Sequence, residues 1–208
     1  MSQANILLEA GTNELEIVEF FLDEPGENGA TYRGCYGVNV AKVLEIIQMP
    51  KITALPEVQH PSVLGAFNLR SRVIPLVDLC VWLGKQHVED KEPPKVVVTE
   101  FNSVTTAFMV TGVNRIHRIS WEAVEPPSKY MSMVSKGTIT GVVKLEERIV
   151  FLLDLEKIVA ELNPALGLRL DMAIDWGSEV RYRALIADDS ALIREMLKDL
   201  MQKANFEV

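Results

Sequence analysis

The sequence predicts a mainly β protein that contains two similar barrel-like subdomains and ends in a short βα segment. Three observations lead to this fold class: short apolar runs with period-two alternation, an internal repeat within those runs, and a change to helical periodicity near the end of the sequence. With 208 residues and 48% hydrophobic content, the chain can bury one large core or two small ones.

The first two predicted strands form a hairpin. The stretches "ELEIVEFFL" at 14–22 and "CYGVNV" at 35–40 both alternate with period two, and glycine residues between them mark a loop. Apolar runs at 63–79 and 96–110 are each broken by polar turn residues and predict two further hairpins. Short strands at this spacing are typical of barrels.

An internal repeat relates two of these regions. Residues 65–79, "GAFNLRSRVIPLVDL", align with residues 141–155, "GVVKLEERIVFLLDL", at an offset of 76 with six identities in fifteen positions. We therefore expect two similar β subdomains, in which each half ends with a hairpin, an Asp-Leu pair and a short helix. Asp78 and Asp154 are interpreted as N-caps of these helices, because aspartate is a favoured N-cap residue. Acidic functional groups are the alternative.

The two copies of the repeat differ at the hairpin turn. Arg70 and Ser71 of the first copy correspond to Glu146 and Glu147 of the second. We expect shared positions to maintain the fold and differing positions to be candidates for function. Arg70 offers five N–H donors in a planar fork, which suits a carboxylate or the backbone carbonyl groups of a partner. An ordinary solvated turn arginine is the alternative interpretation.

The C-terminal segment has a different pattern. Proline, glycine and mixed charge at 163–183 predict a linker, and the apolar run centred on 185–187 predicts a buried parallel strand. "FEV" at 206–208 then begins another strand. Between them, apolar side chains follow one face of a predicted helix, namely Ile193, Met196, Leu197, Leu200, Met201 and Ala204.

Two carboxylates lie between this strand and this helix. In open α/β sheets, ligands bind beyond the carboxyl ends of the strands, which is where Asp188 and Asp189 fall. Carboxylate oxygens suit Mg²⁺, so the pair is a candidate metal site. Stabilisation of the positive end of the helix dipole is the alternative interpretation.

Composition excludes several classes of protein. A net charge of −8 argues against a protein that binds nucleic acid through its phosphates. The first ten residues have no basic segment, and the apolar run at 149–153 is far too short to span a bilayer, so we expect a soluble cytoplasmic protein.

An enzyme that uses a cysteine and a histidine is a rival interpretation. Cys35 and Cys80 have no CxxC partner, so buried thiols are expected rather than a disulfide or zinc site. The three histidines, His60, His87 and His117, show no ligand spacing, and the sequence contains no HExxH, GxSxG or glycine-rich phosphate loop. We therefore favour a protein that is not an enzyme.

Most of the chain resembles a known family. "YGVNVAKVLEIIQMPKITALPEVQHPSVLGAFNLRSRVIPLVDLCVWLG", "TGVNRIHRI" and "ITGVVKLEERIVFLLDL" are similar to the CheW-like coupling domain of bacterial chemotaxis, from residue 14 to about 163. The resemblance implies two five-stranded, SH3-like barrels. It also implies an adaptor that links the cytoplasmic tips of chemoreceptors to the regulatory domain of the chemotaxis histidine kinase and needs no cofactor for this coupling.

The resemblance also implies which residues bind partners. The functional arginine of the family falls on Arg70, preceded by Asn68 and Leu69, and the groove that faces the receptor includes Val43, Glu45 and Ile46. One departure is Ser71, where the family usually has glycine, and a serine there is expected to alter the turn beside Arg70.

The tail resembles a second family. "ALIADDSALIREML" is similar to the start of a response-regulator receiver domain, with Asp188 and Asp189 at its acidic magnesium pair. A CheW-like domain followed by a receiver is the arrangement of the CheV family of chemotaxis coupling proteins, which the chain resembles over its whole length. We expect a CheW-like domain at 1–163, a linker at 164–181 and the first part of a receiver at 182–208.

The receiver is expected to be incomplete. The elements that carry its phosphoacceptor aspartate, hydroxyl residue and lysine have no counterpart in these 208 residues, so Mg²⁺ is expected to bind well only in a complete receiver. We expect residues 182–208 to be loosely packed or to dock on a neighbour.

These resemblances predict a signalling adaptor tuned by phosphorylation of its complete receiver. A phosphate sink that the CheW-like domain anchors to the receptor array is the alternative. The predicted partners are the kinase and the receptor tips, without nucleic acid and without direct membrane insertion. The predicted location is the cytoplasm, at membrane receptor arrays reached through protein contacts.

Overall fold

The computed structural model describes residues 14–26, 29–56, 58, 60–88, 92–101, 104–135, 137–145, 148–162, 182–203 and 206–208. The predicted linker, 164–181, lies outside these residues, and the predicted domain boundaries stay a prediction. The chain divides into two compact units, one made of Met1–Pro127 with Gly141–Leu152 and the other of Ser128–Thr140 with Leu153–Val208.

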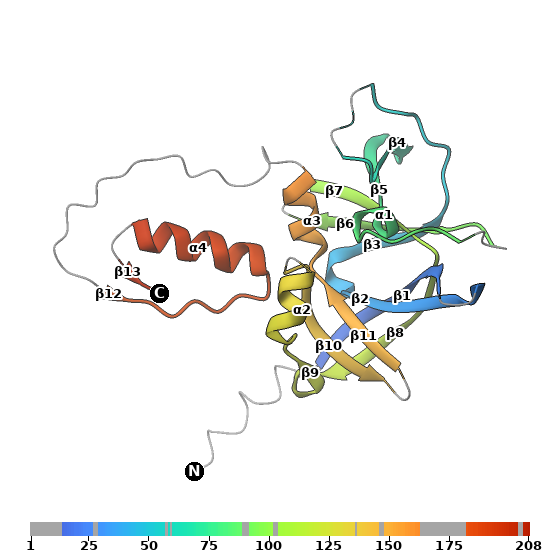
Figure 1. Ribbon diagram of the computed structural model, residues 1–208. Helices are drawn as coiled ribbons and strands as arrows, with labels where there is room; N and C mark the ends of the chain where they lie inside the picture. The colour runs from blue at the N-terminus through green and yellow to red at the C-terminus, as the bar shows by residue number, and fades with distance from the viewer. Residues whose placement is uncertain are drawn as a thin grey trace, which may run out of the picture. The chain divides into compact units, whose positions relative to one another are not determined.

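Strands dominate the structure, as the alternating runs predict (Figure 1). The larger sheet contains β1 (Glu14–Pro25), β2 (Thr31–Asn39), β8 (Gly112–Ser120), β9 (Val124–Glu125), β10 (Ile139–Leu145) and β11 (Arg148–Leu153). The smaller sheet contains β3 (Val43–Gln48), β4 (Val63–Leu69), β5 (Arg72–Asp78), β6 (Lys95–Phe101) and β7 (Val104–Val110). The helices are α1 (Leu79–Trp82), α2 (Lys129–Val134), α3 (Leu155–Leu162) and α4 (Ala191–Lys203), with 3₁₀ turns η2 (Val40–Lys42) and η3 (Trp121–Ala123).

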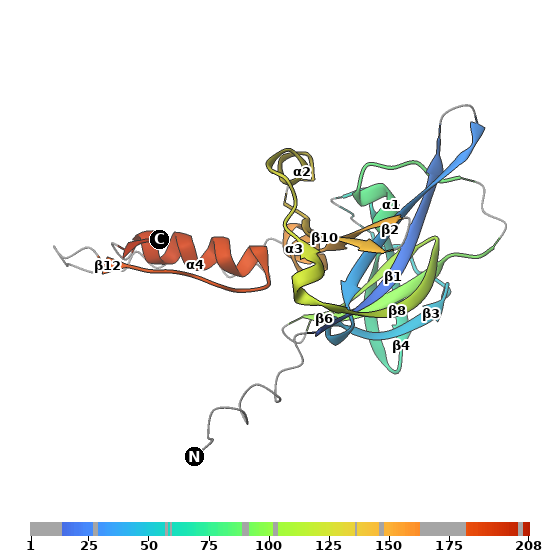
Figure 2. The ribbon, with the colours of Figure 1, turned by 90° about the horizontal axis from the view of Figure 1, so that it is seen from below.

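The predicted hairpins are confirmed. β1 pairs antiparallel with β2, β4 with β5, and β6 with β7. Figure 2 shows β1 and β2 side by side as a long ribbon with β8 along the other edge of β1. Each sheet also contains a parallel pair within its strand order: β5 lies beside β7, and β11 lies beside β2.

Two details of the predicted barrels need correction. The strand orders are β8-β1-β2-β11-β10-β9 and β3-β6-β7-β5-β4, so one sheet has six strands rather than five, and both orders are open among the described residues. The sheets also do not follow the two halves of the sequence. Instead, β1 and β2 join β8–β11, while β3–β5 join β6 and β7. The repeat identifies related hairpins, but strand alternation does not specify which sheet a hairpin joins.

The smaller sheet nevertheless curls so that its two edges approach each other. An isolated antiparallel bridge joins Thr53, which follows the edge strand β3, to Ala66 on the opposite edge strand β4, with N–H···O distances of 2.8 and 2.9 Å. Its core is a buried apolar cluster of Phe67, Ile74, Leu76, Val96, Val98 and Ala107. Burial of this inner face drives the curvature.

The larger sheet has its own core, made of Leu15, Ile17, Val143, Val150 and Leu152. Leu76 and Leu152 belong to the two different cores and are repeat mates, at the offset of 76. The repeat therefore places the same hairpin in two separate hydrophobic cores.

Both predicted N-caps are confirmed. Asp78 Oδ1 accepts the N–H of Val81 at 3.1 Å, and Asp154 Oδ1 accepts the N–H of Lys157 at 3.0 Å. The two copies also share a backbone hydrogen bond. The Asp78 N–H donates to the Ser62 carbonyl at 2.6 Å, and the Asp154 N–H donates to the Thr138 carbonyl at 2.8 Å.

The C-terminal segment contains the predicted helix, α4, and two short strands, β12 (Tyr182–Arg183) and β13 (Phe206–Glu207), which pair in parallel. The expected buried strand at 185–187 is wrong: no strand is assigned there, and Leu185 is 98% exposed. A buried parallel strand needs neighbours that cover its faces, and the periodicity of a run does not supply them. Ala204, expected on the apolar face of α4, lies outside the described residues.

None of the described helices is long and apolar enough to cross a membrane.

Candidate functional site

The candidate site begins at the tip of the β4–β5 hairpin. Leu69 pairs with Arg72, which leaves Arg70 and Ser71 as the two turn residues. Both have positive φ angles, 50° and 68°. Positive φ at both central residues matches the right-handed twist of two-residue hairpins, although it usually calls for glycine or asparagine. Ser71 therefore keeps the tight turn and places Arg70 at its tip.

The turn brings two of the predicted segments together. Arg70 Nη2 lies 3.1 Å from Glu45 Oε2 and makes a salt bridge across 25 residues of sequence. The side chain of Arg70 is 78% exposed and that of Glu45 is 26% exposed. An exposed pair of this kind contributes about 0.2–1 kcal/mol to stability. Its main effect is to orient a guanidinium that mostly faces solvent.

The other predicted residues surround this pair in different ways. Asn68 is exposed, whereas Leu69 is half-buried and packs against the core of the smaller sheet. On β3, Val43 is half-buried and Ile46 is 42% exposed. The three predicted residues of β3 therefore do not share one face.

Exposed apolar side chains on β3 and β5 were missed in the sequence. Leu44 on β3 is 53% exposed, and Val73, opposite Asn68 in the hairpin register, is 77% exposed. The alternating burial of β3 pairs Leu44 with Ile46 on its outer face. The signal for Leu44 was available, because side chains two residues apart in a strand share a face.

A second polar cluster lies in the larger sheet, and no sequence pattern indicated it. Glu19 on β1 is 2% exposed and accepts hydrogen bonds from Asn114 and His117, both at 2.7 Å. Arg148 on β11 donates to it through Nε at 2.7 Å and Nη2 at 3.1 Å. Burial alone would raise the pKa of Glu19, but the hydrogen bonds from Arg148, His117 and Asn114 outweigh it and lower the pKa from 4.5 to about 2.

Comparison with known proteins identifies the family. The sequence model described as "CheW-like domain" matches residues 29–163, which is more than half of the chain. The chain belongs to the CheW-like domain family.

The relatives of this CheW-like chain also support the CheV prediction. The chain is 40% identical to chemotaxis protein CheV3 of Helicobacter pylori over 200 residues, which cover 94% of this chain and 63% of that protein. It is 28% identical to chemotaxis protein CheW of Klebsiella aerogenes over 131 residues, 63% of this chain and 78% of that protein. Resemblance to the CheV family is thus confirmed, and the chain spans about 63% of the length of its CheV3 relative.

A solved structure supports the fold. The scaffolding protein TtCheW from Thermoanaerobacter tengcongensis superposes with a TM-score of 0.58 at 23% identity, over 68% of this chain and 84% of that one. The CheW-like architecture is therefore the one predicted, with the corrections to strand number and closure given above.

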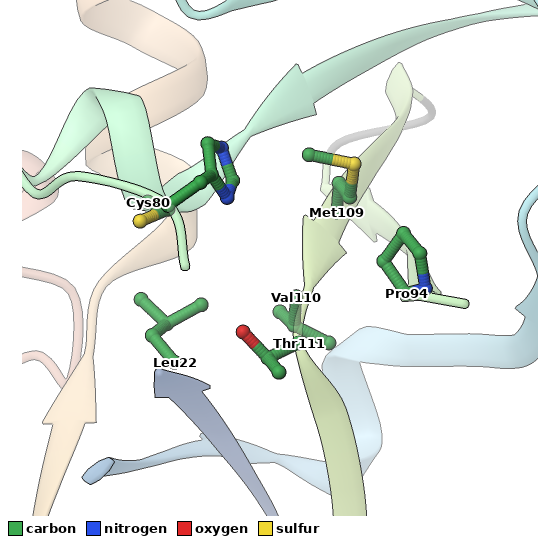
Figure 3. Close-up of a pocket in the computed structure, with 7 residues that line it drawn as sticks. Leu22, Cys80, Pro94, Met109, Val110 and Thr111 are labelled. Carbon is green, nitrogen blue, oxygen red and sulfur yellow. The ribbon is translucent and has the colours of Figure 1, made fainter. Parts of the chain in front are cut away.

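One histidine and one cysteine lie beside the same cavity. His87 Nε2 lies 2.7 Å from Asp78 Oδ2, and His87 and Cys80 line a cavity of about 40 Å³ (Figure 3). Pockets for small-molecule substrates occupy roughly 300–1,000 Å³. At about 40 Å³, this cavity has room for solvent but not for a substrate of that size. Cys80 beside it is only 1% exposed.

The remaining candidates of the enzyme interpretation lie apart from this cavity. His117 is bound to Glu19, and His60 bonds Ser62 and packs on the Trp82 ring. Burial, followed by the charge of Glu19, raises the pKa of the Cys35 thiol, which disfavours the nucleophilic thiolate.

The predicted acidic pair lies at the start of α4. Asp188 and Asp189 are both exposed, and Asp188 Oδ1 accepts the N–H of Ser190 at 2.9 Å. One carboxylate therefore serves the helix start, as the alternative interpretation expects. Among the described residues, no group of three or more His, Cys, Asp or Glu side chains could hold a metal ion. The pair alone does not fit a complete Mg²⁺ site, which remains a prediction for a complete receiver.

Proposed function

We propose that this chain is the coupling portion of a chemotaxis signalling adaptor, which joins chemoreceptor tips to the regulatory domain of the chemotaxis histidine kinase. Membership of the CheW-like family and the names of the relatives support the chemotaxis role. We further propose that coupling requires no catalysis and no cofactor, and that the protein works in the cytoplasm at receptor arrays. The complete receiver would tune this coupling through its phosphorylation and would be the part that needs Mg²⁺.

The Arg70–Glu45 pair carries the proposal. It joins two segments that the family resemblance implicates separately, and exposed Leu44, Ile46 and Val73 lie on the strands that supply them. The amphipathic tip of a receptor helical hairpin needs apolar area for binding and a charge for register. The exposed guanidinium of Arg70 would supply the charge, and the exposed side chains on β3 and β5 would supply the apolar area.

The first test is Arg70→Glu, which gives the turn the acidic residue of the second repeat copy. We expect binding in a ternary mixture with receptor fragment and kinase to weaken by about tenfold or more, or ~1.4 kcal/mol, because an acidic residue repels Glu45 and removes the donors. The free energy of unfolding should change by less than about 1 kcal/mol, since the pair is exposed.

Lys144→Glu is the matched control. Lys144 is the repeat mate of Asn68 on the β10–β11 hairpin, is 65% exposed and pairs with Glu125. It should assemble like the unmodified protein. If Arg70→Glu assembled as well as the unmodified protein, Arg70 would not belong to the site. If both variants lost assembly equally, the change in net charge would explain the loss.

A charge swap separates direct contact from positioning. In the double variant Arg70→Glu with Glu45→Arg, the internal salt bridge can re-form with reversed polarity. If Arg70 contacts the partner directly, the swap leaves assembly impaired. Recovery of assembly would instead make the pair a positioning element for the β3 and β4 surface.

A further inference from the structure

Asp154 has two partners on opposite sides of its carboxylate. Oδ1 caps α3 through the N–H of Lys157, as described above. Oδ2 accepts the N–H of Ala191, the first residue of α4, at 3.2 Å. Asp154 is 8% exposed, and all three residues belong to the second compact unit. One buried carboxylate thus joins the last helix of the CheW-like domain to the first helix of the C-terminal segment.

The repeat shows what this second oxygen does elsewhere. In the first copy, Asp78 also uses Oδ1 to cap its helix, and its Oδ2 bonds His87, nine residues along the chain. In the second copy, Oδ2 reaches a backbone amide 37 residues along. Each aspartate therefore caps its own helix and also fixes a later part of the chain, and only Asp154 fixes a part beyond the CheW-like match.

The start of α4 shows why this amide needs a partner. The first amides of a helix have no intrahelical acceptor. Ser190, itself 8% exposed, donates its N–H to Asp188 Oδ1, and its hydroxyl oxygen accepts the N–H of Ile193 at 3.4 Å. The acceptor for Ala191 comes from Asp154 instead. A carboxylate at this end also interacts favourably with the helix dipole.

We propose that Asp154 is an intramolecular latch that holds α4 against the end of the CheW-like domain. Ala191, whose N–H Asp154 accepts, lies three residues after Asp188. A rearrangement at the acidic pair therefore changes the start of α4, where Asp154 binds. The latch would be the physical link by which the C-terminal segment acts on the coupling domain. That regulatory meaning rests on the proposed function, whereas the latch itself does not.

The sharpest test removes only the donor. Ala191→Pro deletes the N–H that Asp154 accepts, and proline is favoured at the first position of a helix, where the amide has no intrahelical role. Ala191→Ser keeps the N–H and is its control. We expect amide hydrogen exchange across α4 in the full chain to accelerate about tenfold in Ala191→Pro, as for loss of a bond to a charged acceptor, and to stay unchanged in Ala191→Ser.

A second variant removes the acceptor. Asp154→Ser retains a favoured N-cap for α3, but it lacks the second oxygen that reaches Ala191. It should accelerate exchange in α4 as Ala191→Pro does. Asp78→Ser makes the same change in the first repeat copy and should leave α4 unchanged. Exchange at the wild-type rate in both latch variants, or equal acceleration by Asp78→Ser, would overturn the proposal.

The outcome is separable from that of the coupling experiment. Hydrogen exchange reports on the latch without any receptor or kinase. If the unmodified protein failed to assemble with receptor fragment and kinase, the proposed function would fail, while accelerated exchange in the two latch variants would still support the latch.

Discussion

The β4–β5 hairpin and its repeat mate β10–β11 carry an arginine at the same position, but the two arginines meet different carboxylates. Arg148 makes bonds as short as 2.7 Å to Glu19, whose side chain is 2% exposed. Arg72 lies 3.5 Å from Glu100, whose side chain is 36% exposed. The same hairpin frame is therefore joined to its sheet by a buried polar cluster in one copy and by a solvated ion pair in the other.

This difference indicates a division of roles between the copies. In the larger sheet, Arg148 with His117 and Asn114 ties three strands together around Glu19. In the smaller sheet, the apolar core holds the hairpin, and its tip presents Arg70 to solvent. A surface that binds partners needs exposed groups, so the copy whose arginine is not held in a buried polar cluster is the one suited to binding.

Glu19→Gln, paired with Glu100→Gln, tests whether burial distinguishes the two copies. The side chain of Glu19 is 2% exposed, so removing its charge takes the shared carboxylate out of a buried polar cluster, which costs roughly 3–5 kcal/mol. Glu100→Gln removes a solvated pair and should cost less than about 1 kcal/mol. Urea unfolding of both variants measures the two values. Equal losses would mean that burial does not distinguish the two copies.

Acid titration provides a second test of the Glu19 cluster. The pKa of Glu19 is lowered from 4.5 to about 2, so the folded state binds its proton less tightly than the unfolded state. The resulting stabilisation, roughly 3 kcal/mol, is present above the unfolded pKa and is lost as pH falls from 4.5 towards 2.

Glu19→Gln lacks this titrating group and is the control. The difference in unfolding free energy between the unmodified protein and this variant should therefore shrink across that acid range. A difference that stays constant with pH would show that Glu19 titrates alike in the folded and unfolded states.

The glycines at matching positions of the repeat, Gly65 and Gly141, have different surroundings. Gly65 has φ +142°, and a Cβ there would lie 2.4 Å from the Thr53 carbonyl oxygen, in the bridge that brings the edges of the smaller sheet together. At Gly141, the nearest atom to such a Cβ is a Val124 side-chain carbon at 2.7 Å, which can shift more readily than backbone. Gly65→Ala should cost roughly 2–3 kcal/mol and Gly141→Ala roughly 1–2 kcal/mol. Thermal unfolding measures both losses. A larger loss for Gly141→Ala than for Gly65→Ala would show that contact with the backbone does not decide the cost.

Sequence patterns were sufficient for the hairpins and caps because these features are local. Alternation identified β1 with β2, and the Asp-Leu pairs identified both N-caps. Sheet membership depends on pairing between distant segments, so the exchange of strands between sheets could not be read from periodicity. The expected strand at 185–187 failed for the same reason, since burial requires neighbours as well as apolar residues.

The candidate site divides along the same line. Arg70 stood out because the repeat differs there, and family resemblance supplied Glu45. The salt bridge between them could be identified only from the folded structure. Glu19 was hidden because its partners come from residues 114, 117 and 148, which no local pattern associates with it.

The smallest expected effect concerns the turn itself. Ser71 has φ 68°, a conformation that glycine adopts without steric cost and that side chains with a Cβ adopt with strain. Ser71→Gly should raise the unfolding free energy by about 0.5–1 kcal/mol, because relief of strain exceeds the greater entropy that glycine has in the unfolded chain. The melting temperature would rise by a few degrees, at roughly 2–4 °C per kcal/mol for a protein of this size.

Ser71→Ala separates backbone strain from the hydroxyl group. Alanine keeps the Cβ and removes only the hydroxyl, so it should leave the melting temperature near that of the unmodified protein. Stabilisation by alanine equal to that by glycine would mean that the serine hydroxyl, rather than the positive φ angle, sets the cost of this turn. If glycine stabilises alone, then the first repeat copy tolerates a strained residue at the tip that presents Arg70, where a more stable alternative is one substitution away.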